Sequence, residues 1–210
     1  MKARLFVSLF FGAAPLAAVA GACGGGSPAG AVVALDAAGF EGSRLDAPIH
    51  PTARCLVTID APLLLPAEHV PIGTNVTYDS NPPSSGPHYP IWAAYQTYAS
   101  PVPRPYYVHD LEHGAIVFVY QCPAGACSDV VTAMQSAADA IPDDPLCSGE
   151  GVRVRTVITP DPLLDVPVAA AAWGWTYKAE CVDLPSLRQF ALDHYGQGPE
   201  QLCANGQTQF

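Results

Sequence analysis

Residues 106–120 read YYVHDLEHGAIVFVY, and this stretch has two halves of different character. The first half places His109, Glu112 and His113 close together and ends at a glycine. The second half, residues 115–120, is a continuous apolar run rich in β-branched and aromatic residues, which is typical of a strand buried on both faces. The sequence therefore predicts a central strand with a polar His/Glu cluster at its mouth, where a rigid scaffold meets open loops.

Hydrophobic periodicity in the rest of the chain predicts an α+β fold, in which helices pack on a small mixed sheet. Further strands are expected at 53–60, 73–78, 152–159 and 166–177, and a short helix at 91–99. One later helix is expected between Ser128 and Pro142, and another between Asp183 and Gly196. The C-terminal half should thus run strand, helix, strand, strand, helix.

The N-terminus has the features of a secretory signal peptide over residues 1–22: Lys2 and Arg4 precede a short apolar run rich in small residues. Small residues ending at Cys23 resemble the lipid-attachment site of bacterial lipoproteins, and a glycine-rich tether follows. We therefore expect lipidation at Cys23 and a flexible segment over 23–52, with ordinary secretion or a soluble periplasmic protein as the alternative. Residues 53–210 are expected to form a single α+β domain.

Six further cysteines form an even set, which predicts three disulfides in an exported chain. They are Cys55, Cys122, Cys127, Cys147, Cys181 and Cys203. Cys122 and Cys127 are close enough for a local bridge, but they have more residues between them than a redox motif has, so redox catalysis is not inferred. We expect Cys181–Cys203 to clamp the last helix, which leaves Cys55–Cys147.

Composition limits the partners that this chain can have. The formal net charge is −10, and nucleic-acid binding usually needs a basic patch, so no nucleic-acid partner is expected. The 22 prolines imply shaped loops between short elements. The expected partner is the membrane, reached through the lipid anchor, and the sequence names no protein partner or small-molecule ligand.

Three blocks of sequence resemble the bacterial domain of unknown function 3105 family. They are NPPSSGPHYP at 81–90, HDLEHG at 109–114, and the segment from Pro167 to Gly174. The resemblance runs from about residue 69 to residue 200, with Asp110 standing where the family usually has Asn. It brings no established activity. It implies an exported or membrane-anchored domain and marks His88, His109, Glu112 and His113 as positions of interest.

These four residues suit a transition-metal site. His109 and His113 are four apart, so one helical turn would place both imidazoles on one face. His88, held on a stiff proline-rich loop, would be the third ligand, and Glu112 a fourth ligand or a partner that orients an imidazole. Imidazoles suit zinc, copper, nickel or iron, and zinc or copper is the cofactor we expect. The first hypothesis is therefore a metal-binding protein of the cell envelope.

Two other hypotheses stay open. HDLEH matches the H-x-x-E-H pattern of some metalloproteases, so a metal-dependent hydrolase with Glu112 as general base is the second, although a glycine and a strand follow the motif at once. The third is a structural or interaction lipoprotein whose histidines are hydrogen-bonded turn residues. Converging imidazole rings favour the metal hypotheses, and rings saturated by backbone groups favour the third.

Overall fold

The computed structural model describes residues 55–122 and 127–210. Within that part, one five-stranded mixed sheet carries three α-helices, which confirms the α+β class. The elements are β1 (Val57–Asp60), α1 (Arg104–Glu112), β2 (Ile116–Tyr120), α2 (Ser128–Asp139), the 3-10 turn η1 (Pro145–Cys147), β3 (Thr156–Pro160), β4 (Val168–Ala172), β5 (Trp175–Ala179) and α3 (Leu184–His194). The predicted signal peptide, Cys23 and the whole of the predicted tether lie outside the described residues.

Strand β2 is an interior strand of the sheet, between β4 and the edge strand β3. The strand order is β1-β5-β4-β2-β3, with β2 and β3 parallel and the other pairs antiparallel. Every residue of β2 is buried, as the apolar run predicted. Phe118 contributes to one hydrophobic core and its neighbours Val117 and Val119 to a second, because successive side chains of a strand point to opposite faces.

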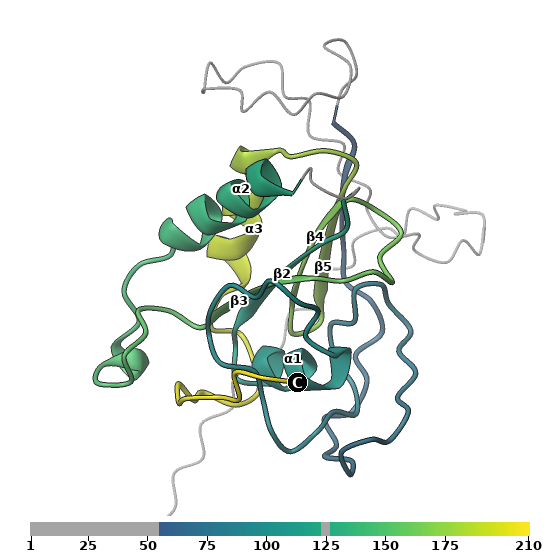
Figure 1. Cartoon of the computed structure of the whole chain (residues 1–210), viewed down its shortest axis with the longest axis vertical. Coiled ribbons are helices and arrows are strands. Elements are labelled where there is room, and N and C mark those ends of the chain that lie inside the picture. The colour runs from purple at the N-terminus through teal and green to yellow at the C-terminus, as the bar shows by residue number, and fades with distance from the viewer. Residues whose placement is uncertain (1–54, 123–126) are drawn as a thin grey trace, which may run out of the picture.

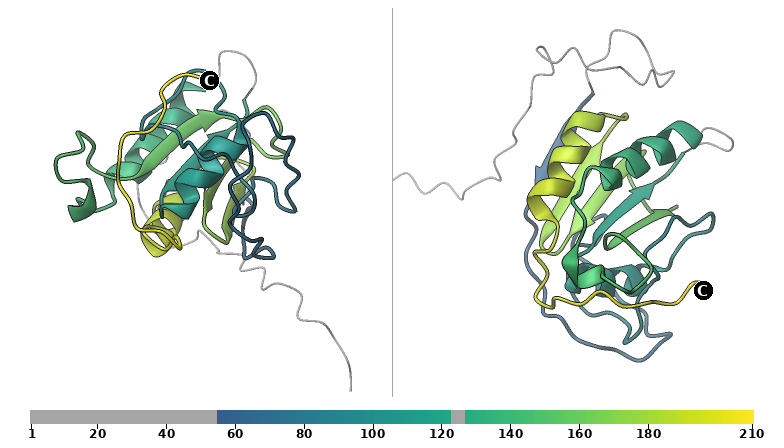
Figure 2. Two further views of the ribbon diagram at one scale, coloured as in Figure 1. Left: turned by 90° about the horizontal axis from the view of Figure 1, so that it is seen from below. Right: turned by 90° about the vertical axis from the view of Figure 1, so that its left-hand side faces the viewer.

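The two cores give the domain three layers. Helices α2 and α3 pack against each other and cover one face of the sheet (Figure 1; Figure 2, right), where Met134 and Phe190 join the first core. Helix α1 and the long irregular segment before it cover the other face, where Tyr107 and Leu111 join the second core. The His/Glu stretch of the sequence therefore belongs to the layer with the least regular structure.

A tight turn joins α1 directly to β2. The Gly114 N–H donates to the Leu111 carbonyl (2.9 Å) and the Ala115 N–H to the Asp110 carbonyl (3.0 Å). This is the Schellman pattern, which needs a left-handed residue after the helix, and Gly114 has φ +83°. This connection fixes the C-terminal end of α1 next to the first residue of β2.

The expected strand at 166–177 is two strands. It divides into β4 and β5, which pair as an antiparallel hairpin with Ala172 opposite Trp175. Gly174 occupies the turn with φ +76°, a conformation that glycine adopts without steric cost. The C-terminal half therefore has one more strand than the sequence predicted, while 53–60 and 152–159 do contribute the edge strands β1 and β3.

Two expected elements are wrong. Residues 73–78 form no strand, and residues 91–99 form no helix. The apolar spacing at 91–99 is helical, but the backbone pairs with distant segments instead. The Ala94 N–H donates to the Gln207 carbonyl (2.8 Å) and the Tyr98 N–H to the Ile158 carbonyl (2.8 Å). These contacts hold the segment between the C-terminal tail and the edge of β3.

The three disulfides are formed, and the local bridge Cys122–Cys127 is confirmed. The other two predicted pairings are wrong, because the structure joins Cys55 to Cys181 and Cys147 to Cys203. The first pair continues the antiparallel register of β1 and β5 by two steps beyond the strands. The second pair ties η1 to the tail after α3, a contact that spacing along the chain does not reveal.

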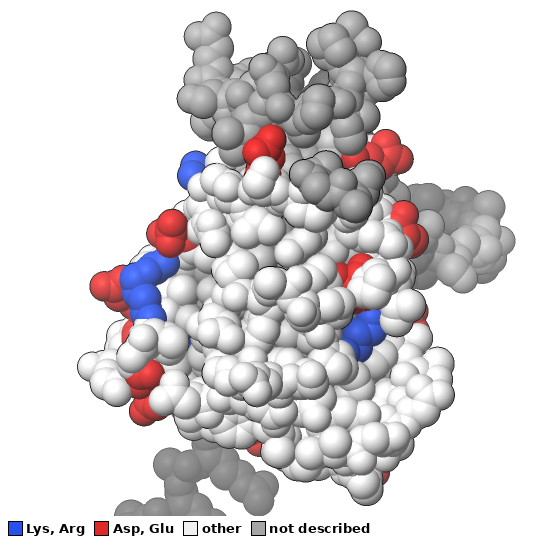
Figure 3. Space-filling model, in the orientation of Figure 1, with Lys and Arg blue, Asp and Glu red and all other residues white. Residues whose placement is uncertain are grey.

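The disulfides indicate an extracellular or other oxidising compartment. Among the described helices, none combines the length and the apolar character that crossing a membrane requires. Figure 3 shows one face of the molecule, on which most side chains are uncharged and the acidic and basic groups lie mainly towards the margins.

Candidate metal centre

Four side chains converge beside the C-terminal end of α1. They are His69, His88, His109 and Glu112, and one donor atom from each lies within 4.8 Å of all the others. Donors around a single ion with bonds of about 2.1 Å lie at most about 4.2 Å apart. Four donors at the corners of a tetrahedron around such an ion lie about 3.4 Å apart, so the widest pair would have to close by roughly 1.4 Å to bind one ion. The rings converge, as the metal hypotheses require.

The donors come from two kinds of local structure, a helix and a bridge between irregular segments. His109 and Glu112 lie one turn apart on α1, so they share a helix face. His88 ends the proline-rich loop, and its backbone forms a short parallel bridge with His69. In this bridge the His88 N–H donates to the Glu68 carbonyl (2.9 Å) and the Val70 N–H to the His88 carbonyl (2.8 Å).

Backbone carbonyls fix the orientation of two of the imidazoles. His88 Nδ1 lies 2.8 Å from the Gly86 carbonyl, and His109 Nδ1 lies 2.6 Å from the Tyr89 carbonyl. A carbonyl only accepts, so each Nδ1 carries the proton. In the neutral rings each Nε2 then has a free lone pair, and this is the arrangement in which histidine ligands of metals are usually held.

The carboxylate faces the same point. Glu112 Oε2 lies 2.9 Å from His88 Nε2, 3.8 Å from His69 Nε2 and 4.0 Å from His109 Nε2. An ionised carboxylate only accepts, yet both nitrogens of His88 now face acceptors. A neutral ring has a single N–H, so the contact between His88 and Glu112 is satisfied either by one more proton shared by the pair or by a bound cation. Three imidazole nitrogens and one carboxylate suit zinc, copper, nickel or iron.

The electrostatics of His109 favour the neutral, ligand-ready form. Burial lowers the pKa of His109 to about 3, despite the hydrogen bond to the Tyr89 carbonyl, and the neighbouring histidines push it in the same downward direction. The ring therefore carries no second proton near neutral pH. A metal ion would not have to displace a proton from its Nε2.

His113 lies next to the group but outside it. It occupies the position after α1, buried against Trp92 with ring centroids 4.8 Å apart. Its Nε2 lies 3.5 Å from a carboxylate oxygen of Glu200, and its Nδ1 has no hydrogen-bond partner among the described residues. Burial, opposed by Glu200, lowers the pKa of His113 to about 4. Of the four ligands expected from the sequence, three thus come together and His113 does not.

His69 is the donor that the sequence analysis missed. No local pattern surrounds it, and it joins the group only through its backbone bridge to His88. The one available signal was that the family resemblance begins at about this residue. Spacing along the chain finds ligands on one helix, but it does not find a pairing between two irregular segments.

Arg104 at the start of α1 holds the proline-rich loop through a hydrogen bond and is itself fixed by a partly buried ion pair. Arg104 Nε donates to Asp161 (2.9 Å), and Arg104 Nη2 donates to the side-chain carbonyl of Asn81 (2.7 Å) at the start of the loop. The Tyr107 hydroxyl donates to the same Asp161 oxygen (3.2 Å). The far end of the loop is tied to α1 as well, because the Tyr89 N–H donates to the Pro105 carbonyl (3.1 Å). The loop that carries His88 is thereby fixed at both ends.

The C-terminal tail crosses the end of α1. The Glu200 N–H donates to the Glu112 carbonyl (3.0 Å), and Trp92 Nε1 donates to the Ala204 carbonyl (3.1 Å). Gly198 packs so closely that an added Cβ would lie 2.2 Å from the Glu112 carbonyl oxygen. The tail therefore supports the backbone of α1 that carries His109 and Glu112.

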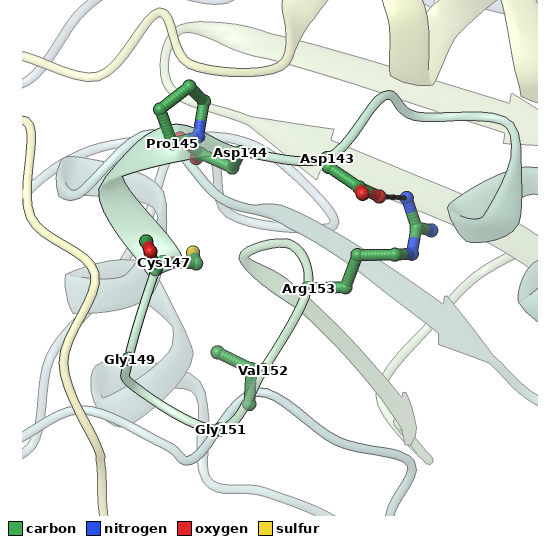
Figure 4. Close-up of a pocket in the computed structure, with 9 residues that line it drawn as sticks. Asp143, Asp144, Pro145, Cys147, Gly149, Gly151, Val152 and Arg153 are labelled. Carbon is green, nitrogen blue, oxygen red and sulfur yellow. Dashed lines mark hydrogen bonds and ion pairs between the residues drawn. The ribbon is translucent and has the colours of Figure 1, made fainter.

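A hollow of about 670 Å³ lies elsewhere, inside the loop 143–153 (Figure 4). Arg153 points across it and meets the Asp143 carboxylate at 3.4 Å. The same guanidinium also donates to the carbonyls of Ile141 and Ala138. Its hydrogen-bonding capacity is thus used within the protein, and the hollow is not part of the metal centre.

Comparison with known proteins supports the family and nothing finer. No curated protein and no solved structure matches the chain. The sequence model of the family described as "Protein of unknown function (DUF3105)" matches residues 69–206, a span that begins at His69 and contains all four donors. The match covers more than half of the chain, so the protein belongs to the DUF3105 family.

Proposed function

We propose that this protein is an exported, lipid-anchored protein of the cell envelope that binds one transition-metal ion, zinc or copper. The ligands would be His69, His88, His109 and Glu112. One observation carries the proposal: two buried imidazoles are held by backbone carbonyls with their Nε2 atoms towards a carboxylate, which is the orientation that histidine and carboxylate ligands have around a bound cation.

The geometry gives less support to a hydrolase. A hydrolytic metal site needs an open coordination position, a general base and a cleft for the substrate. Glu112, the candidate base, lies 2.9 Å from His88 Nε2 and so faces the ion position as a ligand would. The hollow in loop 143–153 lies away from the group.

A purely structural role for the histidines is also less well supported. Backbone carbonyls do accept from His88 and His109, as that hypothesis expects. However, they use only one nitrogen of each ring, and the remaining nitrogens converge on Glu112 rather than diverging. Such an arrangement is costly without a bound cation or an extra proton, because buried polar groups need partners.

Export and anchoring rest on other observations. The three disulfides fit an oxidising compartment, and the sequence before residue 55 has the pattern of a signal peptide followed by a lipid-modified Cys23. Mass spectrometry of the mature protein tests this directly. An N-terminal diacylglyceryl-modified Cys23 would support it, and an unmodified N-terminus at another residue would contradict the lipid anchor.

Metal analysis of the purified mature protein tests the binding site. After incubation with zinc or copper and removal of free metal, the wild-type protein should hold about one ion per chain, as expected for a single four-donor site. His109→Ala should abolish stoichiometric binding, whereas His113→Ala should retain it because His113 lies outside the donor group. Absence of metal from the folded wild-type protein would refute the proposal.

A further inference from the structure

The four donors are not held equally. His88, His109 and Glu112 are buried, and each has a fixed partner. His88 is held between the Gly86 carbonyl and Glu112, and His109 by the Tyr89 carbonyl. Glu112 also sits on the last turn of α1, whose end is fixed by the glycine turn into β2. Three donors are thus preorganised for binding.

His69 differs from these three donors in its exposure and in its lack of a fixed side-chain partner. Its side chain is 52% exposed, and its ring makes no hydrogen bond to any described residue within normal distance, the nearest carboxylate oxygen being 3.8 Å away. Only its backbone is fixed, through the bridge to His88. The ring lies against those of His88 and His109, with centroids 5.0 and 4.8 Å away, so it covers the group on the solvent side.

We propose that His69 is the exchange ligand of the site, the donor through which a metal ion is taken up and handed on. This inference rests on the proposed metal site. When an acceptor presents an imidazole or thiolate, the coordinate bond from His69 Nε2 breaks first and one from the incoming donor forms. Further acceptor donors then replace Glu112, His109 and His88 one bond at a time, with no change in the oxidation state of the ion. The protein would then be a carrier that transfers the ion to another protein, not one that keeps it permanently.

The physical reason is that releasing a buried donor costs more free energy than releasing an exposed one. Releasing a buried donor would leave an unpartnered polar group inside the protein, which is costly. Released His69 can turn into water, where its ring regains hydrogen bonds at once. The lowest-cost route for replacing one ligand by another therefore passes through residue 69, and the three remaining donors hold the ion during transfer.

The test is zinc transfer from the loaded full-length mature protein to the chromophoric chelator 4-(2-pyridylazo)resorcinol. In His69→Ala the ion should still bind stoichiometrically, but transfer should be at least about 10-fold faster, because an open position meets the chelator directly. Added imidazole should slow transfer again by filling that position. In His88→Ala, where the missing ring was fully buried, imidazole should not restore binding.

Val70→Ala is the matched control. It keeps His69 and both backbone bonds of the bridge but removes packing from the same segment, so it should transfer zinc at the wild-type rate. Equal acceleration by Val70→Ala and His69→Ala would overturn the inference, because segment loosening would then explain the effect. Unchanged transfer in His69→Ala would overturn it as well, while leaving the metal site itself intact. A wild-type protein that binds no zinc would refute both the site and the inference.

Discussion

Removing the disulfide between Cys147 and Cys203 should destabilise the domain strongly. The two cysteines are 56 positions apart, and the loop-closure relation for a cross-link of that span gives about 4 kcal/mol in the free energy of unfolding. The double variant Cys147→Ser/Cys203→Ser removes the bond without leaving a free thiol. For a domain of this size such a loss corresponds to a lower Tm by roughly 8–16 °C.

The local bridge provides a matched comparison. Cys122 and Cys127 are 5 positions apart, and the same relation gives about 2 kcal/mol for that bridge. Chemical denaturation without reductant should therefore rank Cys147→Ser/Cys203→Ser well below Cys122→Ser/Cys127→Ser. The ranking follows from the difference in loop length between the two bridges.

The long-range bridge is also linked to the candidate metal centre through the C-terminal tail. Cys203 lies in the tail that crosses the end of α1, next to the Ala204 carbonyl that accepts from Trp92. Loss of the bridge should raise the amide-exchange rate at residues 198–207 more than in α2. Peptide mapping that finds Cys147 joined to any other cysteine, or equal stability of the two double variants, would refute this reasoning.

Three further outcomes are expected. Glu112→Gln removes the one anionic donor and should weaken zinc binding by more than about 100-fold in a chelator competition, while the unfolding midpoint of the metal-free protein changes little. Burial disfavours ionisation of Asp144, but hydrogen bonds from Tyr195 and Leu146 and the Arg155 guanidinium outweigh it, so the pKa of Asp144 lies below its usual value. A lowered carboxyl pKa contributes stability above the unfolded pKa of about 3.9, so Asp144→Asn should be less stable than the wild type at pH 7, and the two should converge as the pH falls through the folded pKa. Gly198→Ala should cost about 1–3 kcal/mol in urea unfolding, since its Cβ would meet backbone atoms that have no room to move.

The sequence predicted the parts of the fold that repeat with a period. The apolar run 115–120 identified the doubly buried strand, and the stripe after Ser128 identified α2. The helix expected at 91–99 failed because long-range backbone bonds outweighed a local apolar pattern. The division of 166–177 into two strands depended on one glycine in a positive-φ turn, which periodicity alone does not detect.

In the candidate site too, local patterns identified some residues, and long-range contacts determine the others. His109 and Glu112 were predictable because helical spacing places them on one face, and His88 because a stiff loop ends on it. His113 fits the same spacing but sits just past the helix, where it turns towards Trp92. His69 and the Cys147–Cys203 bridge depend on contacts between irregular segments, and no local property of the chain encodes them.

The irregular layer has to be stabilised by something other than regular secondary structure. On the opposite face, α2 and α3 satisfy their backbone groups internally and contribute apolar stripes to the core. The segment before α1 instead relies on a partly buried ion pair at Arg104, on backbone bridges and on tail contacts secured by a disulfide. These restraints all meet around His88, His109 and Glu112. A structure that fixes three donors so firmly and leaves His69 exposed is better suited to holding an ion ready for transfer than to stabilising a fold that is already cross-linked.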